Sequence, residues 1–385
     1  MDHTVVRKRI GLILAGLCIC LVGAFLVLLI IDKVAGIVTS KNGFFLVSKP
    51  NQTLIFDTNE FYSEATISAQ GIRNPFVQIP KPANIYRILA LGDSFTFGWG
   101  VAPQEAWVTN VGASLHIPGN TVETVNAAYP GMDIQSQLET CQSYADRFDV
   151  DAVIIGMYIT DDLYQVGSRD DKMTILEKTV STLFPTLRRI SNPYLMESWG
   201  DLEPSGARVS VREKWKKSAL DYAKKTPEAI SLLPEETKSL FLSGEVNPAL
   251  IVNALQDPHY FTRLLDPPIM SLALQSLRKR LTDIRKCVGE KPVTIVILPS
   301  FVLVSEEALQ YGKKFGFSTD NRLLTYDFDT LLKKEADNID AKYISVLSDF
   351  RRDGCPECYY LWDRHLTPLG NQKVAEIVRS KYSDQ

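Results

Sequence analysis

The chain opens with a long apolar run, and shorter apolar runs then alternate with amphipathic stretches. Residues 10–31 form a stretch of 22 residues without a charge. At 1.5 Å per residue, a helix of this length measures about 33 Å and can cross a hydrocarbon core of about 30 Å. The apolar region of a secretory signal peptide is shorter, about 7–15 residues. We therefore predict an uncleaved transmembrane signal anchor over 10–31, with a cleaved signal peptide as the alternative.

The charges around this run predict its orientation. Residues 7–9 are all basic, whereas Asp32 and Lys33 cancel each other behind the run. An excess of basic residues stays on the cytoplasmic side of a membrane. We therefore expect a cytoplasmic tail over 1–9 and a single-pass protein of the cell (inner) membrane, with residues 32–385 on the periplasmic or extracellular side.

The pattern after the run predicts a parallel sheet. Residues 32–80 are mixed in polarity and rich in turn formers, which favours a stalk or extended lead-in. From residue 81 onward, short β-rich runs alternate with helical patterns, the signature of βαβ units. The predicted strands are 86–91, 121–126, 152–158, 292–299 and 343–346, and the predicted helices are 105–115, 134–148, 269–287 and 369–381. The sequence therefore predicts one α/β domain over 81–385.

An insertion interrupts this alternation at about 163–268. Its pattern is helical and loop-like, and it carries basic clusters at 214–217 and 224–225. A run of basic residues is typically a solvated face. The alternatives are a lid over a site, or a surface that meets an acidic glycan or an anionic lipid.

Composition narrows the class of protein. The chain has 385 residues, with 42 Lys and Arg against 45 Asp and Glu and a net charge of -3. This balance excludes a strongly basic nucleic-acid-binding protein. With 45% apolar residues, the chain can bury a core and is not of the disordered class.

Cysteine placement follows from the predicted topology. Cys18 and Cys20 lie in the apolar run, and the other four cysteines face an oxidising compartment. Cys355 and Cys358 form a C-x-x-C in a Gly/Pro loop with no second pair nearby, so we predict a local disulfide between them. Free thiols, redox catalysis and a metal site remain the alternatives.

Two polar motifs carry candidate chemistry. Ser94 follows the first predicted strand within Gly92-Asp93-Ser94, at the strand end where open α/β sheets place ligands. Asp363 and His365 stand two residues apart, just before the last predicted helix. Ser, His and Asp are the nucleophile, general base and orienting carboxylate of serine-dependent acyl transfer. The motif lacks the second Gly of G-x-S-x-G, which speaks against an ordinary α/β-hydrolase elbow.

Together these motifs resemble the conserved blocks of the SGNH (GDSL-like) hydrolase superfamily. Residues 92–94 resemble its first block, residues 126–131 its second, and Asp363-x-His365 followed by Gly370 its last. The blocks occur in family order, and the resemblance covers about 83–162 and 268–382. It implies a three-layer α/β/α, flavodoxin-like fold. The arrangement also resembles membrane-anchored members associated with surface polysaccharides.

The resemblance implies a role for each site residue. Ser94 would be the nucleophile, His365 the base and Asp363 the residue that orients it, while the amides of Ser94 and Gly131 would hold the oxyanion. The third block of the family places Asn, a third oxyanion donor, where this chain has Thr160. A hydroxyl donates one hydrogen bond and reaches less far than an amide. Thr160 is therefore a weaker candidate.

These features predict a carboxylic ester hydrolase. We expect a serine esterase that acts through an acyl-enzyme on O-acyl esters, chiefly O-acetyl, of a cell-surface glycan or glycolipid. The alternatives are an O-acyltransferase with the same triad and a non-catalytic glycan-binding or scaffolding protein. No metal, organic cofactor or nucleic-acid partner is implied. We interpret Asp161 and Asp162 as structural caps, and Trp99, Trp107 and Trp362 as core residues rather than sugar platforms.

Overall fold

A computed structural model describes residues 3–41, 51–164, 183–184 and 208–383. These residues fall into two compact units. One unit spans 1–45 and 172–203, and the other spans 46–171 and 204–385.

The first unit contains helix α1 (His3–Lys41), which is 39 residues long. Its stretch Ala15–Ala35 is long and apolar enough to cross a membrane, and nearly all side chains along it are exposed. The helix continues past the predicted end of the span at residue 31. Length and composition therefore fit the predicted anchor.

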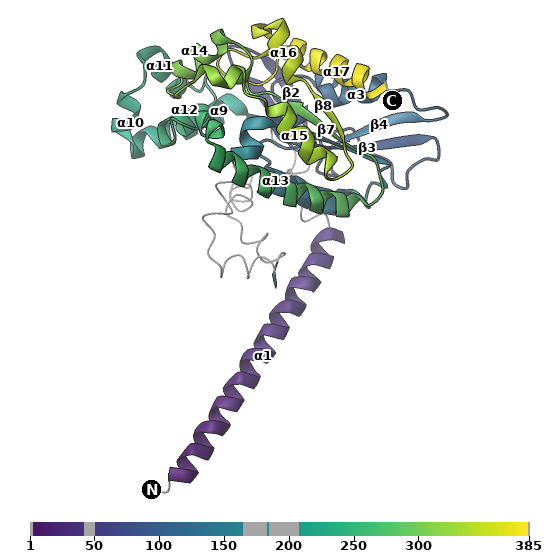
Figure 1. Ribbon diagram of the computed structural model, residues 1–385, viewed down its shortest axis with the longest axis vertical. Helices are drawn as coiled ribbons and strands as arrows, with labels where there is room; N and C mark the ends of the chain where they lie inside the picture. Colours follow the sequence, from purple (N-terminus) through teal and green to yellow (C-terminus); the bar gives the residue numbers. More distant parts are fainter. Residues whose placement is uncertain (1–2, 42–50, 165–182, 185–207, 384–385) are drawn as a thin grey trace. The chain divides into compact units, whose positions relative to one another are not determined.

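The second unit is built on a parallel sheet. Its strands are β3 (Ile85–Gly92), β4 (Thr121–Asn126), β5 (Ala152–Tyr158), β7 (Val293–Leu298) and β8 (Lys342–Ser345). They lie in the order β4-β3-β5-β7-β8, and each neighbouring pair is parallel (Figure 1). Numbered along the chain, this is the 2-1-3-4-5 order of flavodoxin-like sheets. The predicted α/β class with a parallel sheet is confirmed.

Helices cover both faces of this sheet (Figure 1). On one face pack α4 (Ile134–Tyr144), α13 (Pro267–Val288) and α15 (Phe328–Asp337), and on the other pack α3 (Trp107–Ser114) and α17 (Pro368–Ser383). Helix α13 buries a stripe of apolar residues spaced three or four apart, which is the pattern of a helix lying on a core. The stripe consists of Met270, Ala273, Leu277, Leu281, Ile284 and Val288.

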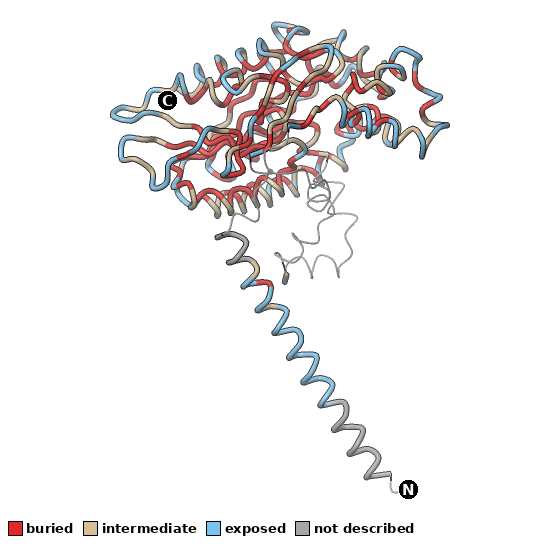
Figure 2. Tube along the Cα trace, turned by 180° about the vertical axis from the view of Figure 1, so that it is seen from behind, coloured by how far each residue is buried: buried red, intermediate tan, exposed pale blue. Residues whose placement is uncertain are grey.

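The sheet forms the centre of the hydrophobic core, as Figure 2 shows. Every residue of β5 and β7 is buried. Such runs are expected where helices cover both faces of a parallel sheet. Shorter helices and 3-10 turns connect the layers: α2 (Ser94–Phe97), η1 (Pro103–Glu105), η3 (Phe301–Leu303), α14 (Glu306–Lys314), η4 (Asn321–Leu324), α16 (Leu347–Asp353) and η5 (Pro356–Cys358).

The described part of the expected lead-in is folded and is not an extended stalk. Strands β1 (Thr53–Asp57) and β2 (Tyr62–Thr66) pair antiparallel, and β6 (Arg208–Ser210) of the insertion pairs parallel to β1. These strands pack into a second apolar cluster that includes Phe56, Trp215 and Tyr360. The prediction needs correction because β1 and β2 are too short for their alternation to stand out, and their partners come from distant segments.

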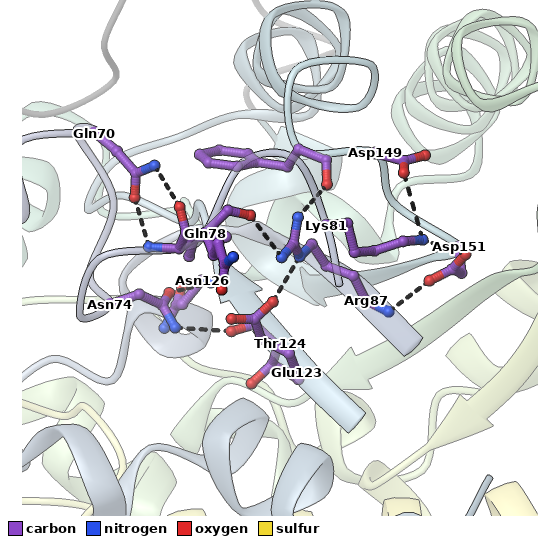
Figure 3. A network of polar contacts seen from close by, with 12 residues as sticks. Gln70, Asn74, Gln78, Lys81, Arg87, Glu123, Thr124, Asn126, Asp149 and Asp151 are labelled. Atoms are coloured by element: carbon purple, nitrogen blue, oxygen red, sulfur yellow. Dashed lines mark hydrogen bonds and ion pairs between the residues drawn. The ribbon is translucent and has the colours of Figure 1, made fainter. Parts of the chain in front are cut away.

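A polar network also ties the end of the lead-in to the sheet (Figure 3). The buried guanidinium of Arg87 on β3 contacts the Glu123 carboxylate at 2.6 Å and donates to the Gln78 carbonyl at 3.1 Å. Lys81 pairs with Asp151 at 2.6 Å, and the same carboxylate accepts the Arg87 amide. The chain therefore enters β3 from a fixed position.

The insertion is helical in its described part, as predicted, while residues 165–182 and 185–207 lie outside the described residues. Its helices are α9 (Val211–Lys225), α10 (Pro227–Ser231), α11 (Glu235–Ser243), α12 (Pro248–Gln256) and the 3-10 turn η2 (Thr262–Leu265). The lysines of α9 are exposed, whereas Trp215 on the same helix is buried. This arrangement matches a solvated basic face.

Two disulfides are present in the second unit. Cys355 is joined to Cys358, and Cys141 of α4 is joined to Cys287 of α13, at a sequence separation of 146. The second pairing could not be derived from sequence, since the strand order decides which helices become neighbours. It fastens together two of the helices on one face of the sheet.

Candidate active site

Ser94 occupies a sharp turn between β3 and α2. Asp93 caps α2 by accepting a hydrogen bond from the Phe95 amide at 2.9 Å. Gly92 has a φ of +153°, and a Cβ there would lie 2.2 Å from the Thr96 hydroxyl oxygen and 2.8 Å from the Gly156 carbonyl oxygen. Only glycine fits so tight a turn. The backbone thereby leaves Ser94 partly exposed while its neighbours are buried.

His365 and Asp363 lie on a short loop before α17. An antiparallel bridge between Tyr359 and Leu366 closes this loop, and Arg364 turns the chain with a φ of +67°. The Arg364 side chain packs against aromatic rings and lies 4.2 Å from the Tyr311 ring centroid. Asp363 and His365 can therefore face the same site although only one residue separates them.

The loop brings both side chains to Ser94. His365 Nε2 lies 2.7 Å from Ser94 Oγ, and His365 Nδ1 lies 2.9 Å from Asp363 Oδ2. The Asp363 side chain is 0% exposed and that of His365 is 12% exposed. With a proton on Nδ1, His365 donates to Asp363 and accepts the Ser94 hydroxyl proton through Nε2. This is the geometry in which a serine hydroxyl is activated as a nucleophile.

Two residues that the sequence analysis missed hold Asp363. Asn247, in the turn that starts α12, donates to Asp363 Oδ1 at 3.3 Å. Glu60, in the turn between β1 and β2, accepts the Asp363 backbone amide at 2.9 Å. These residues lie 116 and 303 positions from Asp363 in sequence, and neither belongs to a motif. No local sequence signal marks them.

Of the predicted oxyanion donors, the Ser94 amide lies at the start of a helix and the Gly131 amide lies in an exposed turn. The Ser94 amide is in the first turn of α2, where backbone N–H groups have no intrahelical acceptor. Gly131 is exposed with a φ of +80°, and its turn is tied to the Ser94 turn because Tyr129 N–H donates to the Gly92 carbonyl at 3.2 Å. Within the described residues, no protein group accepts the Gly131 amide.

Thr160 is fully buried at the start of the helical turn after β5. No hydrogen bond joins its hydroxyl to Ser94 or His365 among the residues that the structure describes. The structure therefore brings Ser94, Asp363 and His365 together and leaves Thr160 outside their hydrogen-bonded set.

Buried acids surround the triad. Burial, and secondly the charge of Asp161, raises the pKa of Asp93 to about 7. Burial also raises the pKa of Asp161 and of Asp162. Asp162 accepts the Tyr158 amide at 2.9 Å, and Asp161 accepts the Tyr260 hydroxyl. Asp162 therefore binds the backbone at the end of β5, as a strand-end acid would, whereas Asp161 binds a side chain of the insertion and caps no backbone group among these contacts.

Aromatic rings enclose His365 on two sides. Its ring centroid lies 5.0 Å from that of Phe95 and 5.5 Å from that of Trp99. Trp99 in turn stacks on Trp215 of the insertion at 6.1 Å. Trp107 is fully buried in the core, whereas Trp99 and Trp362 are half-buried. The insertion thus reaches the catalytic side of the sheet through Trp215 and Asn247.

Metal-binding potential is low in the described part of the chain, where no three His, Cys, Asp or Glu side chains form a group that could hold an ion.

Comparison with known proteins gives weak similarities only. No protein-family model matches the chain, and no curated relative does either. Among solved structures, an acetylxylan esterase from Geobacillus stearothermophilus is 11% identical, with 78% of this chain and 95% of that chain covered and a TM-score of 0.36. A lipase/acylhydrolase from Enterococcus faecalis is 11% identical over 77% and 94% of the two chains, with a TM-score of 0.38. An α/β hydrolase enzyme from the metagenome of Lake Arreo, Spain, is 13% identical over 77% and 94%, with a TM-score of 0.35.

At these TM-scores the similarity carries no functional argument. What the structure itself shows is the flavodoxin-like 2-1-3-4-5 strand order, with the serine turn after β3 and the Asp-x-His loop before α17.

Proposed function

We propose that this chain is a membrane-anchored extracytoplasmic serine esterase that hydrolyses O-acyl esters, chiefly O-acetyl, of a cell-surface glycan or glycolipid. The observation that carries the proposal is the hydrogen-bonded series from Ser94 through His365 to Asp363, at 2.7 and 2.9 Å. Ser94 and His365 are 271 residues apart in sequence. We identify no structural purpose for bringing these two residues and Asp363 together, which favours a catalytic one. The apolar helix α1 supports the anchor.

The reaction follows from the roles of these groups. Ser94 Oγ attacks the ester carbonyl carbon while His365 Nε2 takes the hydroxyl proton. The amides of Ser94 and Gly131 stabilise the oxyanion that forms. His365 then gives its proton to the leaving alkoxide oxygen, and the acyl group remains on Ser94. A water molecule, deprotonated by His365, attacks the acyl-enzyme and releases the carboxylic acid and free Ser94.

Asp363 keeps the imidazole in the required tautomer and stabilises its charged form. The Asp363 carboxylate can do so because it is fully buried and accepts further support from Asn247. Low exposure strengthens this interaction, since water does not compete with it.

Covalent labelling tests the proposal. The full chain in detergent is treated with a fluorophosphonate probe, alongside Ser94→Ala and Ser136→Ala. Ser136 is a matched control because its hydroxyl also contacts a carboxylate, that of Asp133 at 2.6 Å. We expect labelling of the wild type and of Ser136→Ala and none of Ser94→Ala. Equal labelling of all three proteins, or of none, would refute the esterase and leave a glycan-binding role.

Turnover of p-nitrophenyl acetate separates the two catalytic alternatives. A hydrolase releases acetate in water at a rate that glycan acceptors do not change. An acyltransferase instead gains acetylated glycan, at the expense of acetate, as the acceptor concentration rises. Product analysis by mass spectrometry distinguishes the two outcomes.

A further inference from the structure

Glu60 lies outside the parallel sheet, within the β1–β2 hairpin, and yet contacts the loop that carries the triad. It stands in the turn between β1 and β2, and its carboxylate accepts three successive backbone amides. Oε2 accepts the amides of Trp362 at 2.8 Å and Asp363 at 2.9 Å, and Oε1 accepts the amide of Leu361.

We propose that Glu60 is a positioning residue for the triad, which sets the conformation of the 361–365 loop and so the distance between His365 and Ser94. The inference rests on the proposed function for its catalytic consequence.

The chemistry of the contact favours this role over simple surface packing. An ionised carboxylate is an acceptor only and can take hydrogen bonds on both oxygens, so it matches three amides that point in one direction. Bonds from amides to an ionised group are stronger than those between neutral groups. A neutral amide side chain would offer one oxygen and would turn its own N–H groups toward backbone donors. Glutamine in place of Glu60 therefore leaves part of the loop unpaired.

Glu60 is itself held firmly. The neighbouring Asn59 amide donates to Glu245 of the insertion at 2.7 Å. On the other side, the Phe61 ring lies 4.2 Å from that of Tyr360, whose hydroxyl donates to the Gly100 carbonyl at 3.1 Å. The residues on both sides of Glu60 thus have fixed contacts, which fix the position of the Glu60 carboxylate. The three amides that donate to this carboxylate are then held in position as well.

Partial burial of Glu60 makes its ionised form less favourable, and a carboxylate kept at such a free-energy cost is consistent with a positioning role. Desolvation raises the pKa of its carboxyl, and the charge of Asp363 adds to this effect, while the three backbone amides oppose it. Two carboxylates are therefore kept near one another at the edge of the site. Asp363 contacts Nδ1 of His365, the ring nitrogen that does not face Ser94, where its negative charge stabilises an imidazolium.

The test compares Glu60→Gln and Glu60→Ala with Glu64→Gln in the full chain. Glu64 is a matched control because it lies on β2 of the same hairpin, where it contacts Tyr62 and Arg208 on the exposed face. The competent fraction of each protein is counted by fluorophosphonate stoichiometry, so that unfolded molecules do not enter kcat. We expect kcat per labelled site to fall about 10–100-fold in both Glu60 variants, with KM nearly unchanged, because small misplacement of a catalytic group has effects of this size.

Glu64→Gln should retain wild-type kcat. Unchanged kcat per labelled site in Glu60→Gln and Glu60→Ala would overturn the proposal, as would a rise in KM alone, which indicates a substrate contact. A readout without turnover separates this failure from failure of the esterase. The downfield Nδ1 proton resonance of His365, assigned by its absence in His365→Gln, should shift or broaden in Glu60→Gln. An unchanged resonance would overturn the positioning role even if no substrate is ever found.

Discussion

Replacing Asp93 with asparagine should change how the stability of this protein depends on pH. Asp93 is fully buried beside Ser94, and burial raises its pKa from 3.8 to about 7. Its side chain caps α2 by accepting the Phe95 amide. Asparagine is about as good a cap and cannot ionise. The variant therefore removes the titration while the hydrogen bond is kept.

The sign follows from proton binding. Between about pH 4 and pH 7 the folded protein holds a proton on Asp93 that the unfolded chain has released, so the free energy of unfolding falls as pH rises through this window. At about 1.4 kcal/mol per pKa unit, a rise of about three units corresponds to roughly 4 kcal/mol. About 3 kcal/mol of this falls between about pH 5 and pH 8. These are upper values, because Asp161 and Asp162 titrate nearby.

Urea unfolding of the full chain in detergent, followed by tryptophan fluorescence at both pH values, measures the effect. The stability of Asp93→Asn relative to wild type should increase by about 1–3 kcal/mol from about pH 5 to pH 8. The control is Asp327→Asn, another helix cap, where the Thr330 hydroxyl and amide lower the pKa of an exposed carboxyl. There the ionised form is the stabilised one, and the carboxyl titrates below its ordinary pKa of 3.8. Between about pH 5 and pH 8 both the folded and the unfolded chain hold Asp327 ionised, so the stability of Asp327→Asn relative to wild type should stay nearly constant. If Asp93→Asn shows no pH-dependent gain over this window, or a loss, the burial argument is refuted.

Three further predictions follow from single contacts. Asp363→Asn should lower kcat by about 10³-fold or more with folding intact, because the imidazole loses its orienting acceptor; an unchanged kcat would contradict the triad. Gly131→Ala should lose about 1 kcal/mol in urea unfolding, since φ is +80° there while a Cβ would meet nothing within 4 Å; wild-type stability would show that the turn adapts. The Cys141→Ala, Cys287→Ala double variant should lose about 2–5 kcal/mol; reducing agent should then have no further effect on that helix pair.

The core sheet was predictable because its signals are local. The five strands of the parallel sheet, β3, β4, β5, β7 and β8, are short β-rich runs, and each predicted boundary lies within about two residues of the observed one. The complete burial of β5 and β7 follows from coverage by helices on both faces. The order of the strands was implied by the family resemblance and not by the runs themselves. The spacing and polarity of residues along the chain thus predict the strands, whereas the order of the strands in the sheet came from the family resemblance.

The site was predictable only in part. Ser94, Asp363 and His365 stand in short motifs next to elements that the pattern already predicts. Glu60 and Asn247 do not, since each touches the catalytic loop only after distant segments have folded together. The small sheet of β1, β2 and β6 was missed for the same reason. Its strands come from the lead-in and the insertion, and a strand of three to five residues has little pattern of its own.

The sequence by itself determined the apolar helix, the order of strands and helices along the chain, and the residue types able to do acyl-transfer chemistry. Tertiary structure decided which of those residues meet. It set Glu60 and Asn247 around Asp363, paired Cys141 with Cys287, and buried Thr160 completely. The physical reason is the separation in sequence over which each interaction acts. Periodicity and turn chemistry act between neighbours in sequence, whereas hydrogen bonds and burial depend on groups that only the folded chain brings within a few ångströms.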